Sequence, residues 1–535
     1  MIDYKIKIFN IIIFILIFLK ININAQSSDI QWVDEIFERI INTIGDNSLD
    51  EPTLNINKYG NGLAHYSPND NIIHIDQKVI DICKEFKSDS ANCIAFILGH
   101  ELCHRYDNHG WVDRSLRKEY KEFSFMENLK TLSRDSLKRL EMESQADLKG
   151  GFYTFLAGYN SLEIASELLD TLYKRYNLPK QSKNYPSLSE RKKIVSKQLE
   201  KLNRLKNIFS FSTYCFVIGE YDFAIDGFKK IIKEGFVSKE IYNNLGILYF
   251  KSAIKLMRSD DIFAYPFEFD AESRLNENST RAISNFTNHL EIKKLIDFGI
   301  KYLNQAIKRD PYYNSAYLNL SCGNSILAEL YSSDGNLKKD YIKKSKNNLS
   351  RCTSGSDDRT IVEAILLYQE GETTSSVKLF KKLSKSGNNL AAINLFKIKV
   401  EEFDSSFDEC LNVQKNIDSF NPKNILFGFE DFNEPFNSYR LTNYKLLCKE
   451  MPSSKVFLYE GSGSERFLLQ STSILSTTSG IKIGDDIRVL KNKFSEKPDI
   501  FKTNIETYYC FPTCNLLFVV VNEKIKSWLI YQSSI

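Results

Sequence analysis

Hydrophobic residues near the start of the chain recur every four positions, which predicts a helix with one buried face. This face carries Trp32, Ile36, Ile40 and Ile44. Residues 55–75 then alternate between apolar and polar positions, and the alternation is strongest over 71–76. Such a period of two predicts short paired strands, with 71–76 as an edge strand beside a cleft.

Two longer patterns predict helices in the next part of the chain. Residues 94–104 are mostly apolar, with one Gly and no Pro, as in a buried helix. Residues 139–152 also have a helical pattern, with two acids four positions apart on one face. The charged stretch between them, from Asp113 to Lys138, is interpreted as a solvated connector or lid.

Helical patterns return after residue 206 and follow one another in pairs. They cover 221–228 and 244–249, then 299–306 and 316–320, and finally 364–371, 377–383 and 391–396. These pairs resemble degenerate tetratricopeptide repeats, whose helices bury their apolar faces by stacking, and an irregular helical domain is the alternative. Residues 257–295 are interpreted as an insertion.

Short strand-like runs replace the helices after about residue 405. They lie at 425–429 and 456–459, with a turn at 461–464, and further strands are expected at 507–510 and 516–521. Residues 480–490 predict a strand, a tight turn and a capped helix. The resulting division is a targeting segment (1–25), a first domain (26–206), a helical repeat region (207–404) and a β-rich α+β domain (405–535).

Composition is that of a globular protein and excludes few functions. Of 535 residues, 42% are hydrophobic and 26% are charged, and the net charge is +3. No basic stripe is interleaved with aromatic residues, so nucleic acid is not expected as a partner.

The first 25 residues have the features of an export signal. Lys5 and Lys7 precede nine consecutive apolar residues, Ile11–Leu19, and Ala25 precedes an expected cleavage before Gln26. This apolar run is short for a membrane span. We therefore expect an exported protein, periplasmic or extracellular, with a retained membrane anchor as the alternative.

The cysteine pattern does not predict a disulfide framework. Several of the ten cysteines, Cys103 among them, lie in apolar helical runs and are expected to be buried free thiols. Only Cys510 and Cys514 have the spacing of a local pair, and their state as disulfide or free thiols is left open.

The candidate chemistry centres on the helix predicted at 94–104. His100 and His104 are one helical turn apart, so both imidazoles face the same way. This spacing suits two ligands of a tetrahedral zinc ion, with Glu101 as a general base. The alternative is a pair of structural core histidines, but the whole chain contains only 6 His.

Glu143 is the candidate third ligand, completing two histidines and one carboxylate and leaving a fourth position open. Asp147, one turn later, can accept the free N–H of a zinc-bound His and orient its ring. An exposed acidic face is the alternative for this pair. His74 is expected to be a surface residue rather than a ligand, and His109 a cation near a helix C-terminus.

These motifs resemble a known family. His-Glu-x-x-His at 100–104 followed by Glu-x-x-Ala-Asp at 143–147 is similar to the M-48 metallopeptidases, which include CAAX-prenyl, HtpX-like and BepA-like proteases. Residues 71–75, Ala157-Gly-Tyr159 and Pro186 with Glu190-Arg191 also resemble family segments. The resemblance covers about 30–205 and implies a mainly helical gluzincin fold with a small edge sheet, in which Arg191 supports the zinc ligands.

Tyr185 departs from the family pattern, because relatives have His before this Pro. In BepA-like relatives that His can occupy the metal's open position. A phenol is a weaker zinc ligand and a good hydrogen-bond donor, so Tyr185 is a candidate catalytic donor to the oxyanion. A latch that no longer locks and simple packing beside Pro186 are the alternatives.

The sequence therefore predicts an α+β protein that is an exported zinc endopeptidase with one Zn²⁺ per chain. No run after the signal segment is long enough to span a membrane, which favours the BepA-like branch. Expected partners are protein or peptide substrates, such as envelope or misfolded proteins, together with envelope assembly partners held by the repeats. A chaperone-like scaffold with a latent zinc site is the alternative function.

Overall fold

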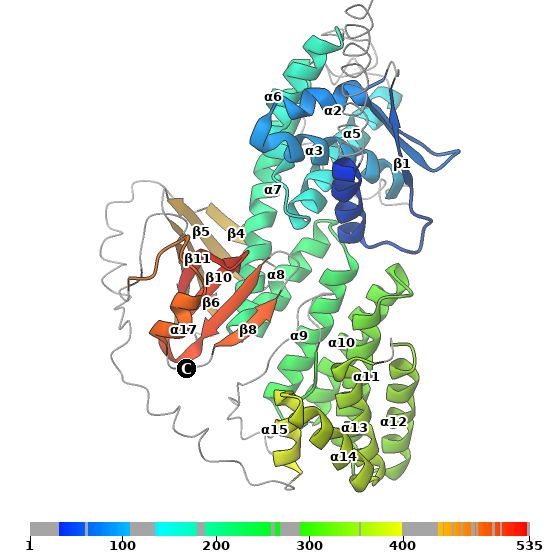
Figure 1. Ribbon diagram of the computed structural model, residues 1–535, viewed down its shortest axis with the longest axis vertical. Coiled ribbons are helices and arrows are strands. Elements are labelled where there is room, and N and C mark those ends of the chain that lie inside the picture. Colours follow the sequence, from blue (N-terminus) through cyan, green and yellow to red (C-terminus); the bar gives the residue numbers. More distant parts are fainter. Residues whose placement is uncertain are drawn as a thin grey trace, which may run out of the picture. The chain divides into compact units, whose positions relative to one another are not determined.

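The computed structural model describes two compact units, residues 1–206 and 207–535 (Figure 1). Within them the described residues are 31–58, 62–106, 134–178, 188–257, 263–267, 289–352, 355–398, 437–441, 443–451, 454–461, 464–471, 477, 480–494, 498–502 and 506–531. The expected signal segment, the 113–133 part of the charged connector and the strand at 425–429 lie outside these residues. Helices dominate the described residues, and the strands form two sheets.

The first unit begins with the expected helix, which covers residues 31–44 and buries Ile36, Ile40 and Ile44. A three-stranded sheet follows, with order β1-β3-β2. Its strands are β1 (Thr53–Asn57), β2 (Ala64–Ser67) and β3 (Ile72–Asp76). β3 runs parallel to β1 and antiparallel to β2. The expectation that 71–76 forms an edge strand is wrong, because β3 is the central strand and β2 lies at the edge.

After the sheet, the described residues of this unit form four more helices and the start of a fifth. They are α2 (Gln77–Lys84), α3 (Ser90–Tyr106), α5 (Arg134–Leu156), α6 (Ser161–Arg175) and α7 (Leu188–Val217), of which residues 188–206 belong here. α3 and α5 contain the two expected helices. α3 is buried along most of its length and packs against α5 and α6, which places it at the core of the unit.

The helical stretches expected between 221 and 396 all lie in helices, except that the one at 364–371 ends at Glu370, and α12 was not expected. The helices are α8 (Tyr221–Lys233), α9 (Lys239–Lys255), α10 (His289–Arg309), α11 (Asn314–Leu330), α12 (Gly335–Leu349), α13 (Asp357–Glu370), α14 (Thr373–Lys385) and α15 (Asn389–Lys397). Each helix contacts the next one in the series. This arrangement agrees with stacked helix pairs, and the assignment to tetratricopeptide repeats stays a prediction.

The C-terminal part of the second unit forms an eight-stranded antiparallel sheet, of order β4-β5-β6-β7-β11-β10-β9-β8. The strands are β4 (Asn437–Arg440), β5 (Lys445–Met451), β6 (Ser454–Gly461), β7 (Ser464–Ser471), β8 (Asp499–Lys502), β9 (Thr507–Phe511), β10 (Leu516–Val521) and β11 (Lys524–Tyr531). β6, β9 and β10 confirm the expected strands, and β6 pairs with β7 as far as Gly461 and Ser464, the two ends of the expected turn.

The strand expected at the start of 480–490 is absent. Gly484 adopts a positive φ and its N–H bonds to the carbonyl of Ile525, so this stretch turns instead of pairing as a strand. The short helix α17 (Arg488–Lys493) follows, and Leu490 packs into the core of the sheet beside Phe511 and Phe518.

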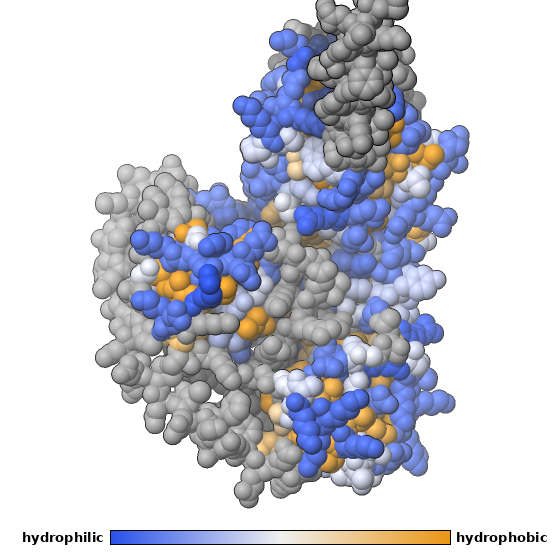
Figure 2. Space-filling view, in the orientation of Figure 1, coloured by the Kyte–Doolittle hydropathy of each residue, from blue (hydrophilic) through white to orange (hydrophobic). Residues whose placement is uncertain are grey.

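The sheet also contacts the helices of its own unit through aromatic side chains. Phe211 of α7 lies 5.9 Å from the ring of Phe457 and 5.0 Å from that of Tyr459, centroid to centroid. Phe223 of α8 lies 4.7 Å from Tyr459. In the space-filling view, hydrophilic residues cover most of the visible surface of each unit and hydrophobic residues form separate patches (Figure 2).

The described cysteines carry thiols rather than disulfides, and Cys103 is buried as expected. For Cys510 and Cys514 the structure favours the thiol alternative, and Sγ of Cys510 lies 3.4 Å from the hydroxyl of Tyr531. Among the described residues, no helix combines the length and apolar character needed to cross a bilayer.

Candidate metal centre

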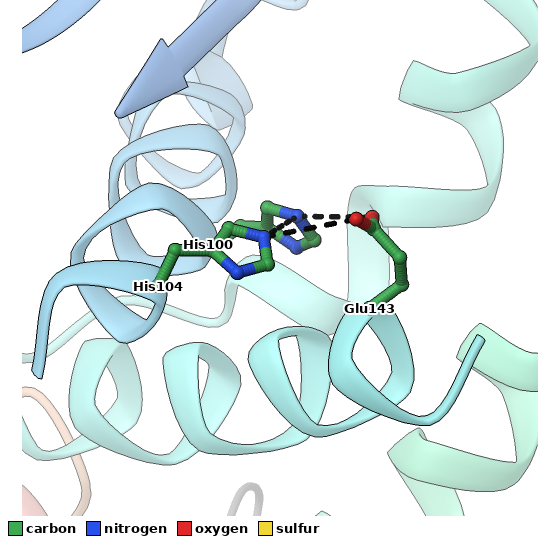
Figure 3. A group of neighbouring side chains, drawn as sticks. All are labelled: His100, His104 and Glu143. Atoms are coloured by element: carbon green, nitrogen blue, oxygen red, sulfur yellow. Dashed lines mark hydrogen bonds and ion pairs between the residues drawn. The ribbon is translucent and has the colours of Figure 1, made fainter. Parts of the chain in front are cut away.

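Helix α3 brings two imidazoles together. His100 and His104 are one turn apart, and their Nε2 atoms lie 3.1 Å from each other (Figure 3). The two rings are nearly perpendicular, with centroids 4.8 Å apart. His100 is only 8% exposed. Helical spacing places both rings on one side of α3, and their Nε2 atoms are directed to a common point.

Helix α5 supplies the third candidate ligand. Oε2 of Glu143 is 3.3 Å from Nε2 of His100, and Oε1 is 3.8 Å from Nε2 of His104. Ligands at ordinary zinc distances in a tetrahedron are about 3.3 Å apart, so these three atoms fit one face of such a site. In the described part of the chain, these three residues form a group whose ligand atoms lie close enough together to hold one metal ion.

Close packing of two glycines sets the distance between the ligand-bearing helices. A Cβ on Gly150 of α5 would lie 2.7 Å from the carbonyl of Gly99 and 2.9 Å from the backbone nitrogen of His100. A Cβ on Gly99 would lie 3.1 Å from the carbonyl oxygen of Gly150. Only residues without side chains allow the backbones of α3 and α5 to approach this closely.

Asp147 and Arg191 form a second layer behind the ligands. Nδ1 of His100 donates to Oδ1 of Asp147 at 2.8 Å, because a carboxylate can only accept. Arg191 of α7 donates to Glu143 at 3.1 Å and to Asp147 at 3.3 Å. Asp147 is 1% exposed. The Asp147 carboxylate thus orients the His100 ring, and Arg191 holds both carboxylates in place.

The pKa values reflect this dense arrangement of charges. Burial by itself lowers the pKa of His100, but hydrogen bonds to Asp147 and Glu143 outweigh it and raise this pKa to about 10. Burial would raise the pKa of Glu143, but the hydrogen bond and charge of His100, with Arg191, lower it to about 2. Burial and the charge of His100 lower the pKa of His104.

The raised pKa of His100 and the lowered pKa of Glu143 favour a proton on Nε2 of His100, directed at Glu143, whereas the lowered pKa of His104 favours its neutral form. An imidazole nitrogen offers its lone pair to a metal only when it carries no proton, so metal binding at these residues releases a proton.

Glu101 lies next to the triad and has a partner of its own. Its Oε2 accepts a hydrogen bond of 3.0 Å from the backbone N–H of Tyr66 in β2. Strand β2 is the edge of its sheet, and this N–H points away from the neighbouring strand β3. The bond fixes the carboxylate of Glu101 between the metal ligands and the edge of the sheet.

The predicted ligands His100, His104 and Glu143 are brought together, and Asp147 and Arg191 surround them as expected. His74 lies on β3, where its ring stacks on His65 and contacts Asn55, so it takes no part in the triad. Tyr185 and His109 lie outside the described residues. Sequence reasoning missed Tyr66, because its contribution is a backbone N–H that any residue other than proline supplies.

Comparison of the chain with protein-family models, with curated proteins and with solved structures found no significant match.

Proposed function

We propose that this protein is a zinc-dependent endopeptidase. The observation that carries this proposal is the convergence of two histidine Nε2 atoms and one carboxylate, beside a second carboxylate that is not part of the triad. Two His and one Glu are a typical donor set for catalytic zinc, which keeps one coordination position open. His100, His104 and Glu143 would hold the ion, one per chain.

A bound zinc ion would polarise the scissile carbonyl and make water more acidic. Glu101 is then the general base, which removes a proton from the attacking water and passes it to the leaving amine. The N–H of Tyr66 binds one oxygen of this carboxylate and keeps the group oriented. Asp147 and Arg191 act as positioning residues, because they hold His100 and Glu143 without facing a substrate.

Among the described residues β2 is an edge strand, and the backbone groups of this edge other than the N–H of Tyr66 suit an extended peptide. An edge strand presents unpaired backbone groups, and a substrate strand can pair with them. The hydrogen bond between Tyr66 and Glu101 shows that this edge borders Glu101, the proposed general base. A peptide paired with β2 would therefore pass beside Glu101, which favours hydrolysis within a chain rather than at its end.

The proposed substrates are proteins of the cell envelope or misfolded proteins. This part of the proposal rests on the export signal expected in residues 1–25, which places the enzyme in the periplasm or outside the cell, with membrane association if the signal is retained. The helices of the second unit would hold such proteins. A Tyr185 hydroxyl that donates to the oxyanion remains part of the proposal.

The decisive experiment compares Glu101→Gln with the unchanged chain. The variant keeps the triad, so it should retain about one zinc per chain, measured by elemental analysis after dialysis. Loss of the general base should reduce hydrolysis of an unfolded protein such as casein by about 100-fold or more. Glu163→Gln is the matched control, because this exposed acid lies on α6 and pairs with Lys206.

Wild-type turnover in Glu101→Gln would refute the role of Glu101. A zinc-loaded wild-type chain that hydrolyses no unfolded protein would refute the peptidase proposal and favour a chaperone-like scaffold with a latent zinc site.

A further inference from the structure

A five-residue segment of the second unit is enclosed by helices without belonging to one. Residues 263–267, Phe-Ala-Tyr-Pro-Phe, form neither helix nor strand. Four of the five are buried, and Tyr265 and Phe267 are each 1% exposed. The enclosing side chains come from α9, α11, α13, α14 and α15. The surface that they form is called here the recognition surface, and it includes Phe250, Ser325, Glu329, Gln369, Phe380 and Asn394.

Asn394 of α15 binds the backbone of this segment. Its Oδ1 accepts from the N–H of Ala264 at 2.7 Å, and its Nδ2 donates to the carbonyl of Ala264 at 3.0 Å. Asn394 is fully buried. A side-chain amide has one acceptor and two donors, so it can pair with both polar groups of one residue, as a neighbouring strand would. This contact does not depend on the side chain at that position.

A second contact is specific for tyrosine. The hydroxyl of Tyr265 lies 3.0 Å from Oγ of Ser325 and 3.1 Å from Oε2 of Glu329. Ser325 in turn donates to Oε1 of Gln369 at 3.0 Å, and Gln369 donates to the carbonyl of Ser325. Polar side chains buried in this way need a partner, and the phenol of Tyr265 provides one. A phenylalanine would leave the network incomplete.

Aromatic contacts flank the tyrosine on both sides. The ring of Phe263 lies 5.3 Å from Tyr368 and 6.5 Å from Phe380, centroid to centroid. The ring centroid of Phe267 lies 5.9 Å from that of Phe250. Nζ of Lys251 lies 5.2 Å from the ring centroid of Phe267.

Pro266 bends the backbone between Tyr265 and Phe267. The N–H of Phe267 bonds to the carbonyl of Tyr265 at 3.1 Å, which closes a three-residue turn. The fixed φ of proline suits the central position of such a turn. The position after the tyrosine therefore favours proline because of its backbone conformation.

We propose that the recognition surface is a peptide-binding site for partner proteins, and that residues 263–267 occupy it as an internal ligand. The partner carries an aromatic residue, any residue, then Tyr-Pro and a second aromatic residue, in a segment without regular secondary structure. Consecutive helices from α9 to α15 also contact one another directly, in addition to their contacts with the segment. An internal ligand competes at a high effective concentration, and a partner must overcome it.

The test uses the full chain and a synthetic peptide of residues 260–270, with a scrambled peptide of the same composition as control. Hydrogen exchange of the unchanged protein is followed by mass spectrometry. Excess peptide should speed the exchange of residues 263–267, because the internal segment is displaced, and should leave α10 unchanged. The same result is expected in Glu101→Gln, which separates this proposal from the proposed hydrolysis.

Two variants make the test quantitative. Tyr265→Ala weakens the internal ligand, so a fluorescent form of the peptide should bind this variant at least ten-fold more tightly than it binds the unchanged chain. Adding Asn394→Ala should remove that binding. A peptide with Phe in place of its Tyr should bind about ten-fold more weakly, as expected for losing a hydrogen-bonded hydroxyl.

No change in exchange at saturating peptide, or no peptide binding by a folded Tyr265→Ala chain, would show that the segment is a permanent part of the core and would overturn the proposal. If the unchanged chain proves to be a dimer that the peptide converts into monomers, the site belongs to a second copy of the chain, which would equally overturn the partner-protein proposal.

Discussion

Replacing Gly150 by alanine tests whether the contact between α3 and α5 sets the geometry of the metal centre. The added Cβ would lie 2.7 Å from the carbonyl carbon and oxygen of Gly99 and 2.9 Å from the nitrogen of His100. These are backbone atoms in the middle of a buried helix, so no side-chain rotation can relieve the contact. The two helices have to separate.

The size of the separation follows from these distances. Ordinary contact of a methyl group begins at about 3.4 Å, so α3 and α5 must part by roughly 0.5–0.7 Å at Gly150. His100 lies directly at this point and Glu143 lies two turns away on the same helix as Gly150. Metal–ligand distances tolerate only about 0.2 Å. We therefore expect zinc affinity to fall by about ten-fold or more, and stability by about 1–3 kcal/mol.

The assay measures zinc affinity by competition with a chromophoric chelator and stability by urea unfolding. Gly151→Ala is the matched control, because its Cβ would meet the side chain of Leu162 at 2.4 Å rather than the backbone of α3. This variant should also lose stability, but it should keep the zinc affinity of the unchanged protein. Equal zinc affinity in Gly150→Ala and Gly151→Ala would refute the argument that the glycine contact positions the ligands.

Two further predictions concern single buried carboxyl groups. Asp147→Asn weakens the hydrogen bond that orients His100, so zinc affinity should fall by about 10–100-fold, and an unchanged value from chelator competition would count against this role. Burial raises the pKa of Glu329 to about 8, so the folded state keeps a proton that the unfolded state loses from about pH 4.5 upwards. Stability should therefore fall as pH rises from about 4.5 to 8. Glu329→Gln should remove this pH-dependent loss. The melting temperature of the variant minus that of the unchanged chain should therefore increase from about pH 4.5 to 8 and then level off. A difference that does not change with pH would contradict the assignment.

Local spacing determined the part of the metal centre that lies on one helix. His100 and His104 are four residues apart in an apolar run, and helical geometry alone directs both rings to one side. The same holds for Glu143 and Asp147 on α5. The helices from α8 to α15 other than α12, and the strands β6, β9 and β10, were likewise predicted, since their hydrophobic periods are local properties of the chain.

Contacts between distant residues were decided only by the tertiary structure. The sequence could not show that β3 is the central strand, because an alternating pattern does not say which neighbours will pair with it. The stretch after Gly480 is apolar enough for a strand. Its residues turn instead, because Gly484 bonds to the backbone of Ile525.

The contacts that sequence reasoning missed likewise join residues that are far apart in the chain. The role of Tyr66 depends on a backbone N–H that meets Glu101, 35 positions later in the chain. Residues 263–267 were interpreted as part of an insertion, yet Asn394, 130 positions from Ala264, binds their backbone. The hydrophobic period of a segment indicates which of its faces is apolar. It does not indicate which distant residue will contact that face, because this depends on how the helices and strands pack against one another.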